Sequence, residues 1–110
     1  MDVEMYSRML PVFLEEAEAK LREMDRAIAA LASDHGDAAA RGALGRAVHT
    51  LRGNAAMLGL SAIVRAAEDI ERRWPLAPAP ADLAALCAAR AGLRVLLDDV
   101  ADDLWSLSTT

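Results

Sequence analysis

The sequence has little of what several classes of protein require. It contains one cysteine and only 4% aromatic residues, so it cannot form an internal disulfide and its core must be aliphatic. The 12 Lys and Arg residues are outnumbered by 17 Asp and Glu residues, and a formal net charge of −5 argues against binding to nucleic acid or to an anionic membrane. There is no apolar run long enough to span a bilayer, and no signal peptide. These absences predict a soluble cytoplasmic protein.

What the sequence does contain favours helices. Alanine, leucine, arginine and glutamate are abundant, and all four have high helix propensity. β-branched residues are sparse and never alternate with polar residues in the period of two that is typical of strands. A length of 110 residues suits one hydrophobic core. We therefore expect a single all-α domain over residues 1–110.

Apolar periodicity and end signals predict four helices, over residues 3–32, 38–58, 62–74 and 80–107. Pro11 lies inside the first helix and should break or kink it, because proline lacks a backbone N–H. Asp37 and Ser61 are expected to cap the second and third helices, and Gly59 to end the second. The connections are short, so neighbouring helices must be antiparallel. This gives an up-down four-helix bundle.

The core should form from the apolar stripes of these helices. Cys87 is expected to pack near the stripe of the last helix, and Trp74 and Trp105 to cover the ends of the core. The expected inward positions are Met9, Val12, Phe13, Ala17, Leu21, Met24, Ile28 and Leu31; Leu44, Val48, Leu51, Ala55 and Leu58; Ile63, Ala66, Ala67, Ile70 and Trp74; and Leu83, Leu86, Ala89, Arg90, Leu93, Leu96, Leu97, Val100 and Leu104.

The second helix carries the feature that indicates a function. A helix turns by about 100° per residue, so the apolar residues between positions 44 and 58 cluster on the side opposite His49. His49 should therefore point outward. The residues on or beside its face are small or basic: Gly42, Gly45, Gly53, Ala56, Arg46 and Arg52.

Such a surface is unfavourable for a helix. Each interior glycine costs about 0.5–1 kcal/mol relative to alanine, so several glycines on one exposed face are not there for stability. They leave room beside His49 for a phosphoryl group or the backbone of another protein. Arg46 and Arg52 supply positive charge suited to phosphate oxygens.

Histidine chemistry then predicts a partner for the ring. An imidazole nitrogen is a good nucleophile near neutral pH, and transfer requires one nitrogen free while another group holds the second N–H. His49 lies eleven residues before Leu60 and Glu71 lies eleven residues after it, so in an antiparallel hairpin both sit about 16 Å from the turn. Glu71 is the expected acceptor of the ring N–H, and Glu68, one turn nearer the bend, is the second candidate.

The run from His49 to Leu60 resembles the signature of histidine phosphotransfer domains, which is His-x-Leu-Lys/Arg-Gly, a stretch of small residues and Leu-Gly. Residues 13–21 are similar to the opening helix of that family, particularly in the amino-terminal phosphotransfer domain of chemotaxis-type kinases. The resemblance implies that His49 is phosphorylated and that Arg52 lies near the phosphoryl group. It also implies that Gly53 allows docking and that Glu71 holds the ring.

Three positions depart from the family pattern. Arg52 stands where lysine is commoner, which keeps the charge but changes the donor geometry. Glu68 stands where chemotaxis-type members often have a second histidine, so a proton shared between two histidines is not expected here. Asn54 replaces a residue that is usually smaller.

The resemblance implies a monomeric phosphoryl carrier of a two-component phosphorelay. It would accept the group from a histidine kinase catalytic domain or a receiver aspartate, and pass it to a response-regulator receiver. The sequence has no nucleotide-binding glycine loop and no metal-binding cluster, so no cofactor is expected. Mg²⁺ is expected only on the partner receiver or kinase. The alternative is a helical adaptor that binds receivers without phosphotransfer. An enzyme with its own hydrolytic centre is disfavoured, because no nucleophile, base and orienting group converge.

Overall fold

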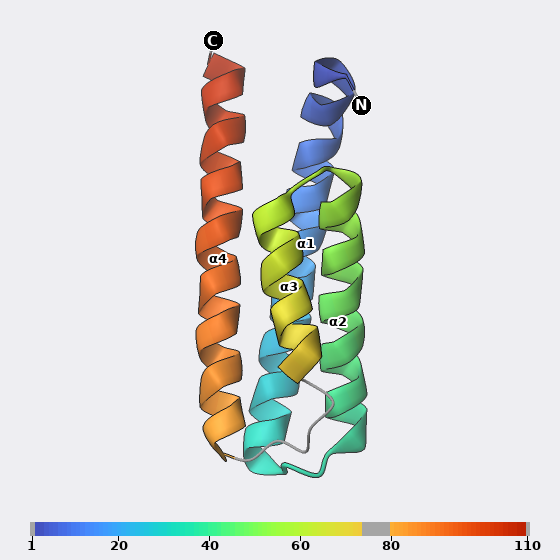
Figure 1. Ribbon diagram of the computed structural model, residues 1–110, viewed down its shortest axis with the longest axis vertical. Helices are drawn as coiled ribbons and strands as arrows, with labels where there is room; N and C mark the ends of the chain where they lie inside the picture. Colours follow the sequence, from blue (N-terminus) through green and yellow to red (C-terminus); the bar gives the residue numbers. More distant parts are fainter. Residues whose placement is uncertain (1, 74–79, 110) are drawn as a thin grey trace.

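The chain folds into a bundle of four α-helices. The computed structural model describes residues 2–73 and 80–109, and these residues contain no strand. The helices are α1 (Val3–Ser33), α2 (Ala38–Met57), α3 (Ser61–Arg73) and α4 (Pro80–Thr109). Each helix runs antiparallel to the one before it, and the ends of α1 and α4 extend past the α2–α3 turn (Figure 1). The predicted all-α, up-down four-helix bundle is therefore confirmed.

The helices occupy the corners of a square. α1 packs against α2 and α4, and α3 packs against the same two helices. Within the described residues the diagonal pairs, α1 with α3 and α2 with α4, have no Cα atoms within 8 Å of each other. No helix in this part of the chain is both long and apolar enough to cross a membrane.

The ends of α2 follow the signals in the sequence. The Asp37 side chain accepts a hydrogen bond from the Ala40 N–H at 3.0 Å and so caps α2, as predicted. At the other end Gly59 has a φ of 70°, a left-handed conformation that glycine adopts without strain. The next N–H, from Leu60, then turns back to the Ala55 carbonyl at 3.0 Å. This closure fixes the angle at which α3 leaves α2.

The predicted break in α1 and the predicted cap of α3 are wrong. α1 continues through Pro11 without a break. Pro11 is exposed, so water can replace the lost hydrogen bond, while Leu10 and Phe13 on either side are buried in the core. Ser61 is the first residue of α3 rather than its cap, because the carbonyl of Leu60 already accepts the first helical hydrogen bond, from Val64.

The core is almost wholly aliphatic, with Phe13 as an aromatic member, and the described residues include no buried polar or charged side chain. Every helix contributes to it. The most deeply buried large side chains are Leu10, Leu21, Met24, Leu31, Leu44, Val48, Leu51, Ile63, Ile70, Leu93 and Leu97. Most of the expected inward positions are therefore confirmed.

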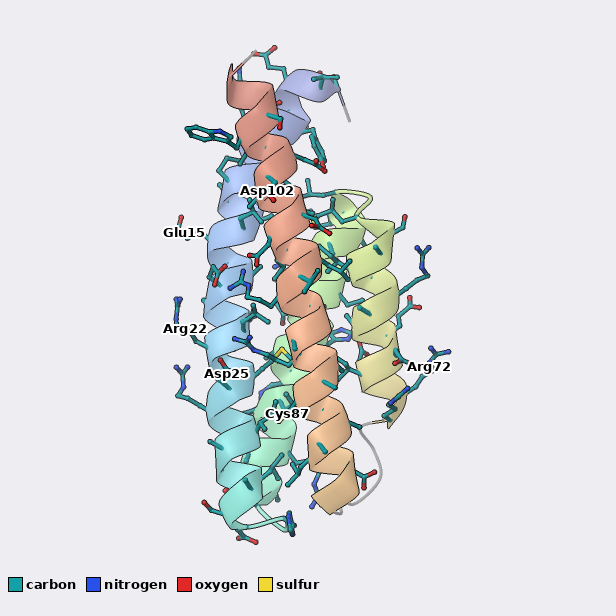
Figure 2. The ribbon with its side chains drawn as sticks, turned by 90° about the vertical axis from the view of Figure 1, so that its left-hand side faces the viewer. Glu15, Arg22, Asp25, Arg72, Cys87 and Asp102 are labelled. Atoms are coloured by element: carbon teal, nitrogen blue, oxygen red, sulfur yellow. The ribbon has the colours of Figure 1, made fainter. Side chains whose placement is uncertain are left out.

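Three predicted core positions are wrong. Val12 is 57% exposed, because Leu10 and Phe13 take the buried stripe and Val12 lies off it. Cys87 is exposed for the same reason, one residue beyond the buried Leu86 (Figure 2). Trp105 is 71% exposed near the end of α4, which extends past the α2–α3 turn. Trp74 lies outside the described residues.

Ion pairs join α1 to α4 along the surface. Arg94 Nη1 donates to Glu18 Oε2 at 2.8 Å, and Arg90 Nε lies 2.8 Å from Asp25 Oδ1. The hydrogen bond from Arg94 lowers the pKa of Glu18, and the same bond raises the pKa of Arg94. These contacts lie on the α1–α4 face, with Asp25 on α1 beside α4 in Figure 2.

Candidate functional site

His49 projects from the middle of α2 into solvent. Its side chain is 66% exposed, whereas Val48 and Leu51 on either side are buried. The helical-wheel prediction that His49 faces outward is therefore confirmed. The other histidine of the chain, His35, is exposed in the α1–α2 turn between Asp34 and Asp37.

Two charged side chains lie against the His49 ring, and we call these three residues the His49 cluster. Arg52 Nη2 lies 3.0 Å from His49 Nδ1, and Arg52 Nε lies 2.6 Å from Glu71 Oε1. Glu71 Oε2 lies 3.6 Å from the same Nδ1. The cluster thus joins α2 to α3, and the arginine contacts both the carboxylate and the ring.

The α2–α3 hairpin explains why Glu71 reaches the ring. Both residues are eleven positions from Leu60, and the helical rise of about 1.5 Å per residue places them at the same height. The structure brings Glu71 to Nδ1, although 3.6 Å is too long for a hydrogen bond. Glu68, the second candidate, is exposed and takes no part in the ion pairs of the cluster.

The direction of helical side chains explains why Arg52, and not Arg46, touches the ring. Helical side chains lean toward the helix N-terminus. Arg52 follows His49 by three residues and so leans back onto it. Arg46 precedes His49 by three residues and leans away, over Gly42, where an added Cβ would lie 3.1 Å from Arg46 Nη1. The structure therefore leaves Arg46 outside the His49 cluster.

Gly53 keeps the space above the ring open. It lies four residues after His49, so a side chain at this position would lean back toward the ring. Apart from its chain neighbours and the backbone of its own helix, a Cβ added to Gly53 would meet no described atom within 4 Å, and the φ of Gly53 is not positive. Neither packing nor backbone conformation requires glycine here. Ala56, one turn further on, is also exposed and small.

The N-terminal half of α2 forms an open groove that leads to His49. Gly45, four residues before the histidine, is one of the residues that line it. The groove is lined by α2 alone, through Ala38, Arg41, Gly42, Gly45, Arg46, His49 and Thr50. The sequence predictions did not include Arg41 or Thr50, although the same helical wheel places both within about 100° of His49.

All charged residues of α2 are basic. α2 carries Arg41, Arg46 and Arg52 and no acidic residue, in a chain whose net charge is −5. The surface around His49 is therefore suited to an anionic group or to an acidic partner. The described residues contain no group of three or more His, Cys, Asp or Glu that could hold a metal ion.

One contact near the site was not expected from the sequence. Asn54 Nδ2 donates to Glu16 Oε2 at 3.4 Å, which ties α2 to α1 beside Gly53. The position departs from the family pattern in the sequence, and this bond gives its larger side chain a structural role. No sequence signal connects two residues so far apart in the chain.

Comparison with known proteins identifies a family. A family model described as the Hpt domain matches residues 8–106. No curated protein and no solved structure matches the chain. The matched range includes His49, Arg52 and Glu71.

Proposed function

The chain belongs to the Hpt domain family, and we propose that His49 is the side chain on which it carries a phosphoryl group. Hpt domains have a histidine phosphotransfer role in phosphorelays, exchanging the group with kinase and receiver domains and lacking an ATP site of their own. The chain has two histidines. Only His49 lies on a helix with an arginine and a glutamate at its ring, and this observation carries the proposal.

The chemistry follows from which nitrogen is accessible. Nδ1 faces Arg52 and Glu71, so Nε2, on the far edge of the ring, is the nitrogen that a partner can reach. Nε2 attacks the phosphorus of an aspartyl phosphate, the P–O bond to the aspartate breaks, and the carboxylate leaves with the bonding electrons. The ring then carries a positive charge, which Glu71 stabilises by accepting the Nδ1–H.

Onward transfer is the reverse of this step. A receiver aspartate attacks the phosphorus, the P–N bond breaks, and its electrons return to Nε2. Arg52 lies close enough to the ring to pair with phosphoryl oxygens in either direction. The divalent metal that assists the reaction would be held by the partner.

The surface around His49 supports a receiver domain as the docking partner. Gly53 and Ala56 let a backbone approach closely on one side of the ring, and the groove with Arg41 and Arg46 lies on the other. A receiver presents an acidic site around its own aspartate, which complements a helix free of acidic residues. We propose that one receiver binds one monomer of this domain.

The test is transfer of labelled phosphate to the purified domain. Donors are a panel of receivers phosphorylated on aspartate, and a chemotaxis-type kinase core with ATP. We expect acid-labile, base-stable label on the wild type and on His35→Gln, and none on His49→Gln. His35→Gln is the matched control, because it removes the other histidine and leaves the helices intact.

Two results would contradict the proposal. Label that survives His49→Gln but is lost in His35→Gln would assign the phosphoryl group to the turn. Binding of a receiver with no transfer from any donor would favour the alternative, an adaptor without phosphotransfer. The donor that labels the wild type shows on which side of the phosphorelay the domain acts.

A further inference from the structure

We infer that Arg52 holds the resting His49 ring in the tautomer that cannot react through Nε2, and that Arg52 must leave Nδ1 before phosphoryl transfer. This inference deepens the proposed function, because it concerns how the same histidine becomes reactive. It rests on the contest between Arg52 and Glu71 for a single ring nitrogen.

The contact with Arg52 sets the position of the ring proton. A guanidinium group can only donate hydrogen bonds, so Nδ1, at 3.0 Å from Arg52 Nη2, must offer its lone pair. A neutral imidazole carries one N–H, and that proton is then on Nε2. Nε2 has no free lone pair in this tautomer. The nitrogen that faces the partner is therefore not a nucleophile.

Glu71 favours the opposite tautomer but is held back. Its carboxylate could only accept a proton from Nδ1, yet Oε2 stands at 3.6 Å and Oε1 is in contact with Arg52 Nε. Arg52 thus contacts both His49 Nδ1 and the Glu71 carboxylate, the two groups that must hydrogen-bond to each other before the ring can react. Its side chain and that of Glu71 are only 33% and 30% exposed, so this ion pair is shielded more than an ordinary surface pair.

The resting arrangement is also one that Arg52 can leave. Arg52 Nε and Glu71 Oε1 are buried and close, but neither makes a well-aligned hydrogen bond. A phosphoryl group offers a guanidinium two parallel hydrogen bonds from charged oxygens. An incoming phosphoryl group would therefore draw Arg52 outward.

Departure of Arg52 makes the ring reactive. The Nε2 proton passes to water and Nδ1 takes a proton from water, so the ring keeps one proton in all. Glu71 then accepts the Nδ1–H, and the lone pair freed on Nε2 attacks the phosphorus. The same arginine that blocks the resting ring ends on the phosphoryl oxygens, which makes reactivity depend on the presence of a phosphoryl donor.

The test is the tautomer of His49, read from its imidazole ¹⁵N shifts by NMR. Spectra are taken on the alkaline plateau, where the ring carries one proton, and His35→Gln identifies the second set of signals. We expect mainly Nε2–H in the wild type. In Arg52→Gln the ratio should move toward Nδ1–H by about fivefold to tenfold, as expected for a partly exposed hydrogen bond to a charged group.

Three further variants make the assignment specific. The shift in Arg52→Gln should be smaller in the double variant Arg52→Gln/Glu71→Gln, because the carboxylate that accepts the Nδ1–H is then also removed. Arg46→Gln removes an arginine equally distant along α2 and should leave the ratio unchanged. Arg52→Lys should also move toward Nδ1–H, because one ammonium group cannot span Glu71 and the ring as the fork of arginine does.

The inference is wrong if the wild-type ring is already mainly Nδ1–H, or if a folded Arg52→Gln leaves the ratio unchanged. Helical circular dichroism checks the fold of each variant, and Arg52→Lys gives a second reading of the same contact. The measurement needs no partner and no phosphate. Its failure would leave the assignment of His49 as phosphoacceptor to be decided by the His49→Gln transfer assay alone.

Discussion

Replacing Gly53 by alanine should stabilise the domain and slow phosphotransfer at the same time. Apart from its chain neighbours and the backbone of its own helix, an added Cβ meets no described atom within 4 Å, so the variant can fold without strain. Alanine in a helix interior is favoured over glycine by about 0.5–1 kcal/mol. For a domain of this size that corresponds to a rise in Tm of about 2–8 °C.

Phosphotransfer should be slower because the added methyl group lies where a docked receiver would approach α2. A methyl group inserted into a close-packed contact costs about 1–3 kcal/mol, and about 1.4 kcal/mol is a factor of ten in rate. We therefore expect transfer from a phosphorylated receiver to Gly53→Ala to be roughly tenfold slower than to the wild type. Thermal unfolding measures the rise in Tm, and rapid-quench kinetics measure the fall in the transfer rate.

Gly92 provides the matched control. It lies inside α4, which is diagonal to α2. Apart from its chain neighbours and the backbone of its own helix, a Cβ added to Gly92 also meets no described atom within 4 Å. Gly92→Ala should raise Tm by a similar amount and leave transfer unchanged. If Gly53→Ala is stabilised and still transfers at the wild-type rate, then Gly53 is not there for docking. If it is destabilised, the glycine has a structural role that the open space around it does not reveal.

Two further predictions concern carboxylates. Glu71→Gln should slow transfer into His49 by about tenfold, because a neutral amide accepts the ring N–H more weakly than a carboxylate, whereas Glu68→Gln should transfer normally in the same assay. Glu18, whose pKa is lowered by Arg94, should stabilise the fold above the ordinary carboxyl pKa and lose that contribution as pH falls through the lowered value. Because the Glu18 side chain is 44% exposed, urea unfolding should show Glu18→Gln less stable than the wild type by under about 1 kcal/mol at pH 7, with the difference shrinking toward pH 2. Equal transfer rates for Glu71→Gln and the wild type, or a Glu18 difference that persists in acid, would contradict the respective argument.

The fold was predictable because its signals are local and repeated. Apolar stripes in all four helices, the Asp37 cap and the left-handed Gly59 act over a few residues, and short connections leave little choice of topology. The mistakes at Val12 and Cys87 share a cause. Each lies about 100° from the buried stripe, an offset that a pattern of apolar residues cannot resolve when both faces carry them.

The sequence predicted that His49, Arg52 and Glu71 lie close together, but not how they contact one another. Equal spacing about Leu60 fixes the heights of His49 and Glu71, because the helical rise is constant. The spacing does not predict whether Arg52 or Glu71 contacts Nδ1, because that depends on side-chain rotamers. Arg52 and Arg46 differ in a way that is already present in the sequence. One follows His49 and the other precedes it, and helical side chains lean toward the N-terminus, so only the arginine that follows can cover the ring.

The two faces of α2 explain how such a site can exist on a stable domain. The inner face packs Leu44, Ala47, Leu51 and Ala55 with no exposed surface, and the α1–α4 ion pairs lie away from it. Truncating one such leucine would cost about 2–5 kcal/mol, several times the cost of one exposed glycine. The fold is therefore stabilised mainly by buried side chains, which a docking partner would not contact. The outer face is left free to carry glycines, which are unfavourable for an isolated helix, together with unbalanced positive charge and an exposed histidine. This combination suits the proposed phosphoryl transfer.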